Sequence, residues 1–587
     1  MTISGKALLV KTDAQLQQSA ERVLFLGPWC RESHHSTAGG SILPHHLDDI
    51  NRVDEWEKKI NEIYDYYLSE ISLRLNEIHD TNWSDRAWRV LIGPWLQVFL
   101  DVVIDRFETI QQVTQSSEDL FISVTKFENK CFSYLRTVDF FVAAANSDEF
   151  NEYIFSEILL RLPEWRGLIS NIVGRNSQTT PSLQRHSSLP QKALRIASRW
   201  VARFPRRITF VDSYFNRADQ VFLEILLGQL PFIPPPDEVA SQECSNNQIR
   251  QELTVKPFSS EMLHRIICEL IQELLPISYV ENFKRNLSEA QGCYPKSSRL
   301  IVTAHFYSYN ELFRFWAASQ VDHGARLAAI QHGGGYGVGL RWSPLAHELS
   351  VADLYYTSGW RSNTHCSTLP MSIPKLVSAK NRFSVSPTGG IVWVWKALRP
   401  YSFRLAEGSV NNDSAEYLDE QIRFGNRLDK NIQSQTTIRL YGLDSAWNEV
   451  KLARAKLPNM KLDLGRIAFE NAARDKRLWV ITYNSTTLLE ALVANIPFVA
   501  YWNPKHCVNR LAKDASPLIE EFRNCGVFHD TPESAADAAN EYFPRAQQWW
   551  ERKNIQRIRT EFCEKFALTR SDWLSTWRHE LERVSSL

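Results

Sequence analysis

Short apolar runs alternate with amphipathic segments from residue 208 onward. The apolar runs predict strands at 208–211, 300–303, 327–330 and 354–356. Residues 261–275 and 311–320, which lie between these runs, have helical character. Asn310 is placed to cap the second of these helices, and Gly324 stands where that helix should end. Strands that alternate with helices predict βα units and a parallel sheet.

A second series of the same kind follows residues 384–390, a stretch rich in Ser, Pro and Gly that we predict to be an interdomain linker. Its strands are predicted at 391–395, 437–440, 478–481 and 498–501. A helical tail rich in aromatic residues and arginine runs from 535 to 584. We therefore expect an α/β fold of two Rossmann-like domains that face a cleft. In open α/β sheets, ligands bind at the carboxyl ends of the strands.

The N-terminal part of the chain departs from this alternation. A strand at 23–26 is followed by apolar residues that recur at three- and four-residue steps from 54 to about 173, which predicts helices. Residues 175–192, rich in Ser, Gln and Pro, predict an exposed loop. The predicted parts are an N-terminal α/β domain over 1–385 with a helical insertion at about 54–205, a C-terminal α/β domain over 386–545, and a helical tail over 546–587.

The composition is that of a large globular protein. The 587 residues include 67 basic and 67 acidic side chains, and 44% are hydrophobic, which excludes a disordered or fibrous chain. A net charge of zero offers no overall attraction to nucleic acid, so we expect no nucleic-acid partner. Nine scattered cysteines without a C-x-x-C pair predict free thiols in a reducing compartment.

No segment predicts a leader peptide or a membrane span. Residues 1–15 lack the long apolar core of a signal peptide. The most apolar long stretch, 90–104, falls short of the ~20 apolar residues that cross a bilayer. We therefore expect a soluble, cytoplasmic protein.

The sharpest motif is Gln331-His332-Gly333-Gly334-Gly335-Tyr336-Gly337, directly after the predicted strand 327–330. Consecutive glycines let a backbone pass close to a ligand and offer unobstructed N–H groups to an anion. His332 can take a proton from a hydroxyl or donate to a phosphate near neutral pH. We predict a functional site here; the alternative is a tight βα turn with a structural histidine.

Several other motifs are absent. His-Gly-Gly-Gly is also the oxyanion segment of lipases and esterases, but the G-x-S-x-G elbow that they require does not occur in this chain. There is no Walker A sequence and no strand-coupled G-x-G-x-x-G, which argues against ATP hydrolysis and dinucleotide chemistry. The Asp-x-Asp pair of metal-dependent nucleotide-sugar enzymes is missing as well, so we expect no metal and no cofactor.

A second motif, Asn484-Ser485-Thr486-Thr487, follows the predicted strand 478–481 and opens the next helix. Hydroxyls and free backbone N–H groups at a helix start bind phosphate well. Glu490, one turn later, can accept a hydrogen bond from a ribose or sugar hydroxyl. We predict a phosphate site at this position; the alternative is an ordinary helix cap.

Three further side chains stand at predicted strand ends. Arg439 can pair with a diphosphate or with a neighbouring carboxylate, and its position leaves both uses open. Trp29 and His34 follow the first strand and are predicted to line the same cleft from the N-terminal side, with a surface loop as the alternative. The tryptophans of residues 83–95 recur at helical spacing, which predicts core packing.

Four segments of the chain resemble a known protein family. The stretches FLGPWC (25–30), WSDRAWRVLIGPWL (83–96), QHGGGYG (331–337) and the segment 439–502 resemble a family of transferases encoded in bacterial O-antigen and surface-polysaccharide clusters. The resemblance runs nearly end to end. More distantly, the second half is similar to the GT-B glycosyltransferases that build capsules and teichoic acids.

The resemblance implies a glycosyltransferase that uses a nucleotide sugar and a glycan or lipid-linked glycan acceptor. His332 is then the candidate base or phosphate contact, residues 485–487 hold the donor phosphate, and Glu490 contacts the ribose or sugar. The N-terminal domain is then the acceptor side and the C-terminal domain the donor side. The chain departs from its relatives after Tyr356 and lacks a His-Pro pair at Arg439, which weakens any assignment of the sugar.

Other functions remain open at this point. The same fold can serve a polyol-phosphate transferase, a nucleotide-sugar epimerase, or a non-catalytic subunit of glycan assembly. Contact with a membrane is also open, because the tail carries a set of aromatic and basic residues: Trp549, Trp550, Arg552, Lys553, Arg557 and Arg559. The alternative, which we favour, is a tail packed back across the cleft, because it has no large free apolar face.

Overall fold

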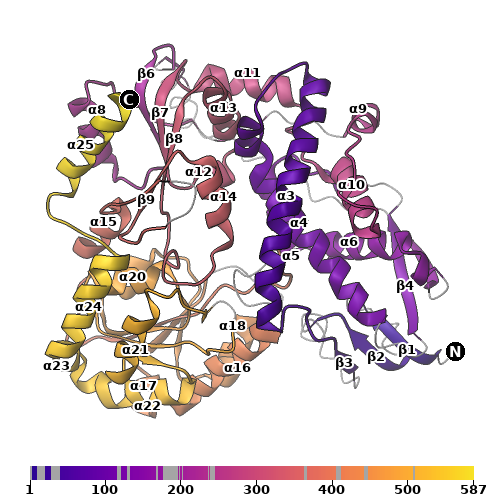
Figure 1. Cartoon of the computed structure of the whole chain (residues 1–587). Coiled ribbons are helices and arrows are strands. Elements are labelled where there is room, and N and C mark those ends of the chain that lie inside the picture. Colours follow the sequence, from indigo (N-terminus) through magenta and orange to yellow (C-terminus); the bar gives the residue numbers. More distant parts are fainter. Residues whose placement is uncertain are drawn as a thin grey trace.

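The computed structural model contains three parallel β-sheets with helices around them (Figure 1). It describes residues 3–9, 20–27, 40–114, 120–127, 132–166, 169–175, 196, 199–200, 202–235, 237, 239, 245–362, 367–404, 412–441, 447–506 and 509–586. The predicted α/β class with parallel sheets is confirmed, but the sequence predicted two sheet-bearing halves and the structure has three sheets.

The first sheet along the chain is the one that the sequence did not predict, and its strands lie between residues 3 and 175. Its strands, in the order β3-β2-β1-β4-β5, are β1 (Ile3–Leu9), β2 (Ala20–Phe25), β3 (Gly40–Ile42), β4 (Leu120–Phe127) and β5 (Ile169–Arg175). Its helices are α3 (Ile50–His79), α4 (Asp85–Thr114), α5 (Thr137–Asn146) and α6 (Asp148–Arg161). The segment predicted as a helical insertion therefore also supplies β4 and β5. These short strands stand among long helices whose 3.6-residue periodicity dominates the sequence pattern.

The second sheet has the order β10-β9-β8-β7-β6. Its strands are β6 (Arg206–Val211), β7 (Ser298–Thr303), β8 (Arg326–Ile330), β9 (Leu354–Thr357) and β10 (Ser367–Pro370). Its helices are α8 (Arg217–Leu226), α11 (Phe283–Cys293), α12 (Phe306–Tyr309), α13 (Glu311–Asp322), α14 (Ser343–Val351) and α15 (Pro374–Arg382). Helices α9 (Asn247–Glu252) and α10 (Met262–Leu274) follow β6 in the sequence but pack against α3 and α4 of the N-terminal part (Figure 1). The predicted cap of α13 is confirmed, because the Asn310 side chain accepts from the Phe313 N–H at 2.7 Å.

The last sheet has the order β13-β12-β11-β14-β15-β16. Its strands are β11 (Gly390–Val394), β12 (Thr436–Arg439), β13 (Lys461–Asp463), β14 (Lys476–Ile481), β15 (Phe498–Tyr501) and β16 (Phe528–His529). Its helices are α16 (Asn412–Arg427), α17 (Lys430–Gln433), α18 (Glu449–Lys456), α19 (Phe469–Ala473), α20 (Thr486–Val493), α21 (Ser516–Asn524) and α22 (Pro532–Tyr542). The strand order reverses between β11 and β14, and such a switch point is where open α/β sheets bind ligands.

Helix α4 is the core of the N-terminal part. It packs against α3, α6, α13 and α14, and its Trp88 and Trp95 are fully buried, as the helical spacing of the tryptophans predicted. Residues Asp85–Val113 are long and apolar enough to cross a membrane, but 89% of the most apolar window is buried inside the protein. That degree of burial is typical of a core helix.

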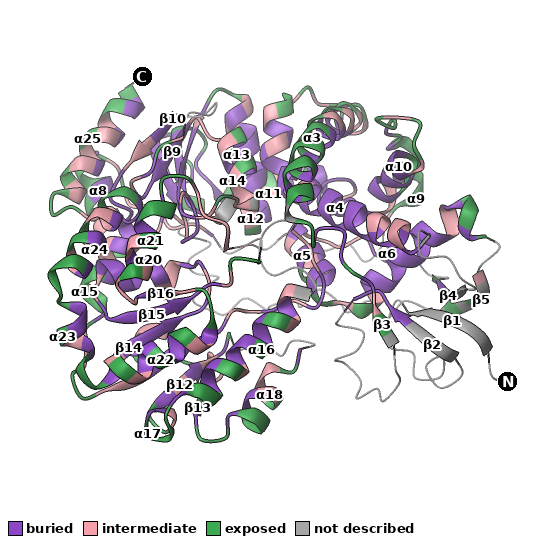
Figure 2. Cartoon of the chain, turned by 60° about the horizontal axis from the view of Figure 1, so that its bottom comes forward, coloured by how far each residue is buried: buried purple, intermediate pink, exposed green. Residues whose placement is uncertain are grey.

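The C-terminal tail consists of α23 (Ala546–Trp550), α24 (Lys553–Phe566) and α25 (Trp573–Ser586). Helix α24 packs on α20 and α21 beside the last sheet, and α25 packs on α8, β6 and β7 of the second sheet. The tail thus returns across two sheets, as we favoured. Trp549 and Trp550 are buried, so the idea that these two indoles contact a membrane is wrong. Figure 2 shows buried residues in purple along the elements of the chain.

Candidate functional site

The loop after β8 is fastened to the end of β9 by Gln331. The buried Gln331 side chain accepts hydrogen bonds from the Ser358 backbone N–H at 3.0 Å and from the Trp360 indole N–H at 2.7 Å. Its own amide donates to the Gly333 carbonyl at 2.8 Å. Gln331 therefore fixes the direction in which the glycine-rich loop leaves the sheet.

Glycine is required in this loop for two reasons. Gly335 and Gly337 have φ angles of 96° and 72°, in the left-handed region that side chains with a Cβ avoid. At Gly334, a Cβ would lie 2.2 Å from the carbonyl carbon of Ser485. The loop thus approaches the backbone in front of α20 more closely than any other residue type permits.

The two motifs that the sequence predicted separately touch each other. The Gly334 N–H donates to the Thr486 hydroxyl oxygen at 2.9 Å, across 152 residues of sequence. A second connection lies nearby, where Gly339 forms an isolated antiparallel bridge with Leu511. The carboxyl ends of β8 and β14, which belong to different sheets, therefore meet at this point.

His332 is paired with a carboxylate that sequence analysis missed. Its Nδ1 lies 3.2 Å from Glu348 Oε1 and 3.0 Å from the Tyr336 hydroxyl. The hydroxyls of Tyr336 and Tyr355 donate to the two carboxylate oxygens of Glu348 at 2.8 and 2.6 Å. Nε2 lies 3.4 Å from the Tyr336 hydroxyl and does not contact Glu348, so it is the imidazole nitrogen that is placed to exchange a proton with a substrate.

Glu348 is ionised although it is buried in α14. Burial by itself raises the pKa of a carboxyl, but the charge of His332 and hydrogen bonds from His332, Tyr355 and Tyr336 outweigh it and lower the pKa of Glu348. A buried anion beside Nδ1 stabilises the imidazolium that forms when His332 accepts a proton. Burial cannot be seen in the sequence, so no sequence signal distinguished Glu348 from other helical glutamates.

A second histidine stands beside the first. The His305 and His332 rings are 4.8 Å apart, and His305 Nδ1 lies 3.8 Å from Asp212 Oδ2. Burial and the neighbouring His332 lower the pKa of His305 to about 3, so His305 is neutral at physiological pH. Asp212 and Tyr214 both have positive φ, at 47° and 62°, and non-glycine residues in this conformation often mark functional sites. Asp212 and His305 follow predicted strands, so the strand-end rule could have found them.

Lys375 is a further site residue that sequence analysis missed. It lies in the first turn of α15, and its ammonium is 3.5 Å from the His332 carbonyl oxygen and 4.8 Å from the centre of the Tyr214 ring. Burial lowers its pKa, while Glu490 acts in the opposite direction. A basic residue thus lies between the strand-end histidine and α20.

The predicted donor-side residues surround the start of α20. Asn484, Ser485 and Glu490 are buried, whereas Thr486 and Thr487 are half-buried. Ser485 occupies the N-cap position without a side-chain cap hydrogen bond. Burial raises the pKa of Glu490, and the charge of Lys375 opposes that effect. The residues predicted on the donor side therefore lie together around the start of α20. Gly333 and Gly334, in the loop after β8, lie against them.

Three predicted residues are not part of this assembly. Arg439 pairs with Asp463 of the neighbouring strand at 2.5 Å, which is the structural use that its position left open. Trp29 and His34 lie outside the residues that the structure describes.

Two groups of described side chains are close enough to hold a metal ion: His45, His46 and Asp105, and Asp413, Glu416 and His506. In the first group, Asp105 accepts from both histidines and also pairs with Arg106. That carboxylate is therefore already compensated by protein groups. Neither group includes His332, Glu348 or the residues around α20.

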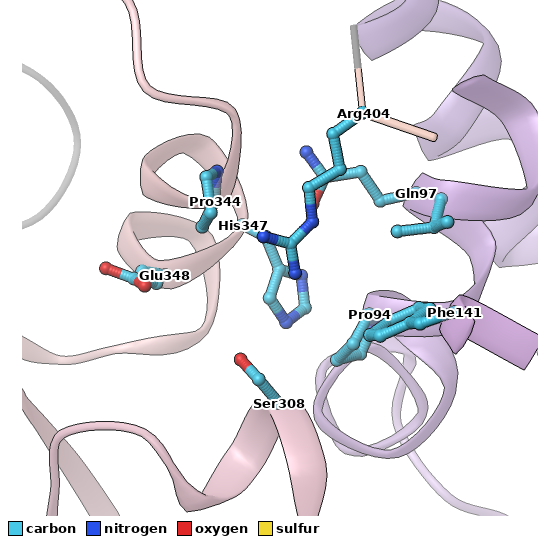
Figure 3. Close-up of a pocket in the computed structure, with 9 residues that line it drawn as sticks. Pro94, Gln97, Phe141, Ser308, Pro344, His347, Glu348 and Arg404 are labelled. Atoms are coloured by element: carbon cyan, nitrogen blue, oxygen red, sulfur yellow. The ribbon is translucent and has the colours of Figure 1, made fainter. Parts of the chain in front are cut away.

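The N-terminal helices support the site through α14. A cavity of about 20 Å³, room for one water molecule, lies beside Glu348 and His347 and is bordered by Pro94 and Gln97 of α4 (Figure 3). At Gly93, one residue earlier, a Cβ would lie 2.6 Å from the His347 ring and 2.5 Å from the Tyr64 hydroxyl. Gly93 is thus the position at which α4 approaches the helix that carries Glu348.

Replacing Gly93 with alanine should therefore destabilise the protein and disturb the site. Overpacking of this kind costs about 1–3 kcal/mol, more than alanine gains in a helix. The matched control is Gly292→Ala in α11, where a Cβ meets nothing within 4 Å. Denaturant unfolding of both variants measures the difference, and a Gly93→Ala protein as stable as the control would contradict it.

Comparison with known proteins identifies the family of this chain. A search of curated proteins finds no match to this chain. Among solved structures, the crystal structure of Acinetobacter baumannii MurG aligns with 65% of this chain and 99% of that chain, with 10% sequence identity and a TM-score of 0.31. The family model described as LIC12162 family transferase matches residues 7–581, nearly the whole chain, and the chain therefore belongs to this family of transferases.

Proposed function

We propose that this chain is a metal-independent glycosyltransferase of GT-B type, in which the second and last sheets form the acceptor and donor domains. It moves a sugar from a nucleotide-activated donor to a bacterial surface glycan of the O-antigen lipopolysaccharide or capsule type. One observation carries the proposal: the Gly334–Thr486 hydrogen bond joins a histidine loop at one set of strand ends to a phosphate-type helix start at another. Family membership supports transfer chemistry.

In the proposed reaction, His332 Nε2 takes the proton of the acceptor hydroxyl. The acceptor oxygen forms a bond to the anomeric carbon of the donor sugar, and the bond from that carbon to the phosphate oxygen breaks. The electron pair leaves with the nucleotide phosphate. Glu348 holds the His332 ring through Nδ1 and stabilises its protonated form, a role supported by the 3.2 Å separation.

On the donor side, the phosphates bind to the first N–H groups of α20 and to the hydroxyls of Thr486 and Thr487. The positive end of a helix dipole and oriented N–H groups favour the charge that develops on the leaving phosphate. Glu490, one turn further, binds a ribose or sugar hydroxyl. The missing Asp-x-Asp pair supports a mechanism in which protein groups take the place of a divalent ion.

We also propose a cytoplasmic location, with access to a lipid-linked glycan at the inner face of the membrane, and no nucleic-acid partner. A lipid-linked acceptor requires only that the reacting end of the glycan reach His332.

A thermal-shift titration with CMP, CDP, UDP, GDP and dTDP tests the donor site. A ligand that binds only the folded protein stabilises it by ~2.7 kcal/mol at one hundred times its dissociation constant. We expect one nucleotide to raise the melting temperature equally with and without EDTA. Stabilisation that disappears in EDTA would contradict the metal-independent mechanism, and no stabilisation by any nucleotide would favour a non-catalytic subunit.

A further inference from the structure

Lys375 is placed where the two sides of the proposed active site meet. It belongs to α15, which packs directly against α20, the helix that begins at Thr486 and carries Glu490. The Lys375 ammonium lies 3.5 Å from the carbonyl oxygen of His332, the proposed base. One cation is therefore near both the strand-end histidine and the phosphate-type helix start.

The position of Lys375 is unfavourable for folding in three respects. Burial opposes its charge and lowers its pKa. It stands in the first turn of a helix, where the macrodipole disfavours a positive side chain. Among the residues that the structure describes, no carboxylate lies within the 4.0 Å of an ion pair with Lys375, and Glu490 and Asp212 act on it only at longer range.

A half-buried cation without a close counter-ion can bind an anion that the folded chain does not itself supply. The Tyr214 ring, 4.8 Å from the ammonium, holds it in place without neutralising it. We infer that Lys375 binds the phosphate group of the donor and compensates the charge of the leaving group, an inference that rests on the proposed function and identifies its cation. When the anomeric carbon–oxygen bond breaks, the electron pair moves to a phosphate oxygen beside this ammonium, while the acceptor proton moves to His332.

The stability of a variant without Lys375 distinguishes an anion-binding lysine from a purely structural one. If Lys375 served only to pair with the buried Glu490 or the half-buried Asp212, its removal would leave that carboxylate uncompensated and would destabilise the protein. If Lys375 serves an anion, its removal relieves an unfavourable charge and leaves the ligand-free protein as stable as before or more stable. If Lys375 binds an anion, a variant that lacks it should therefore keep its stability and lose function.

The experiment uses the full-length chain and inorganic pyrophosphate as the probe. We compare wild type, Lys375→Met and Lys375→Arg with Lys380→Met, which removes an exposed lysine five positions later on the same helix. We expect pyrophosphate to raise the melting temperature of wild type and Lys380→Met but not of Lys375→Met, whose ligand-free melting temperature equals or exceeds that of wild type. Lys375→Arg should keep part of the response, because it keeps the charge. Sugar transfer by Lys375→Met should fall on the order of 10²-fold, the typical effect of removing one group that stabilises a leaving charge.

The inference and the proposed function fail in different ways. An unchanged pyrophosphate response in Lys375→Met, or no response in wild type, overturns the inference. Transfer at the wild-type rate by Lys375→Met also overturns it and leaves the glycosyltransferase proposal intact. A pyrophosphate response that requires Lys375, in a protein that transfers no sugar from any nucleotide sugar, supports the anion site and overturns the proposed function.

Discussion

Replacing His332 with alanine is expected to lower sugar transfer by ~10²–10⁴-fold, the range that general-base catalysis contributes. Nucleotide affinity should change only a few-fold, because the proposed phosphate contacts come from α20 and Lys375. Turnover and nucleotide binding are measured separately, by product release and by thermal shift. The matched control is His579→Ala, which removes a histidine with 77% of its side chain exposed on α25.

Glu348→Gln tests whether the histidine works as part of a pair. Glutamine keeps the shape and can still accept from Tyr336 or Tyr355, so the protein should fold, but the anion beside His332 Nδ1 is lost. We expect a smaller fall in kcat than for His332→Ala. Full activity in His332→Ala would remove His332 from the mechanism, and an unchanged kcat in Glu348→Gln would show that the carboxylate does not act with the histidine.

Much of the last two sheets could be predicted from the sequence because their strands are buried on both faces. β7, β9, β14 and β15 each contain an unbroken apolar run, over 300–302, 354–356, 478–481 and 498–501, as is typical of parallel strands covered by helices on both faces. The first sheet could not be predicted in the same way. β4, with the sequence LFISVTKF, mixes polar and apolar residues and is surrounded by helices with a much stronger periodic signal.

The candidate site was predictable only where a motif follows a strand. The His332 loop and the start of α20 were found because glycines and hydroxyls cluster directly after apolar runs. Glu348 and Lys375 lie inside or at the start of helices, and their importance comes from burial and from partners distant in sequence. Arg439 follows the same strand-end rule but is not a site residue, because it pairs with the Asp463 carboxylate on the adjacent strand.

The second large effect on activity is expected from a change at the contact between Gly334 and Thr486. Gly334→Ala should lower transfer by about 10²-fold, because a displacement of about 1 Å in a positioned reactant can cost that much. The added Cβ would lie 2.2 Å from the Ser485 carbonyl and 2.4 Å from the Thr486 nitrogen, and both are backbone atoms that cannot rotate away. The loop that carries His332 must then move away from α20. Global stability should change much less than activity, because the substitution acts between two units that each have their own sheet.

A double-mutant cycle separates this effect from general damage to the loop. Thr486→Val removes the hydroxyl that accepts from the Gly334 N–H while it keeps the side-chain volume. Thr486→Val also removes a proposed phosphate contact, so the cycle compares kcat at saturating donor. If the Gly334–Thr486 contact is what holds the two motifs in register, kcat of the double variant should be little lower than that of Gly334→Ala alone, since one contact cannot be broken twice. Gly292→Ala, at a position with free space around it, is the control for the glycine-to-alanine change. Losses that simply multiply would show that the two residues act independently, and the proposed active site would then have to lie on one side of this contact only.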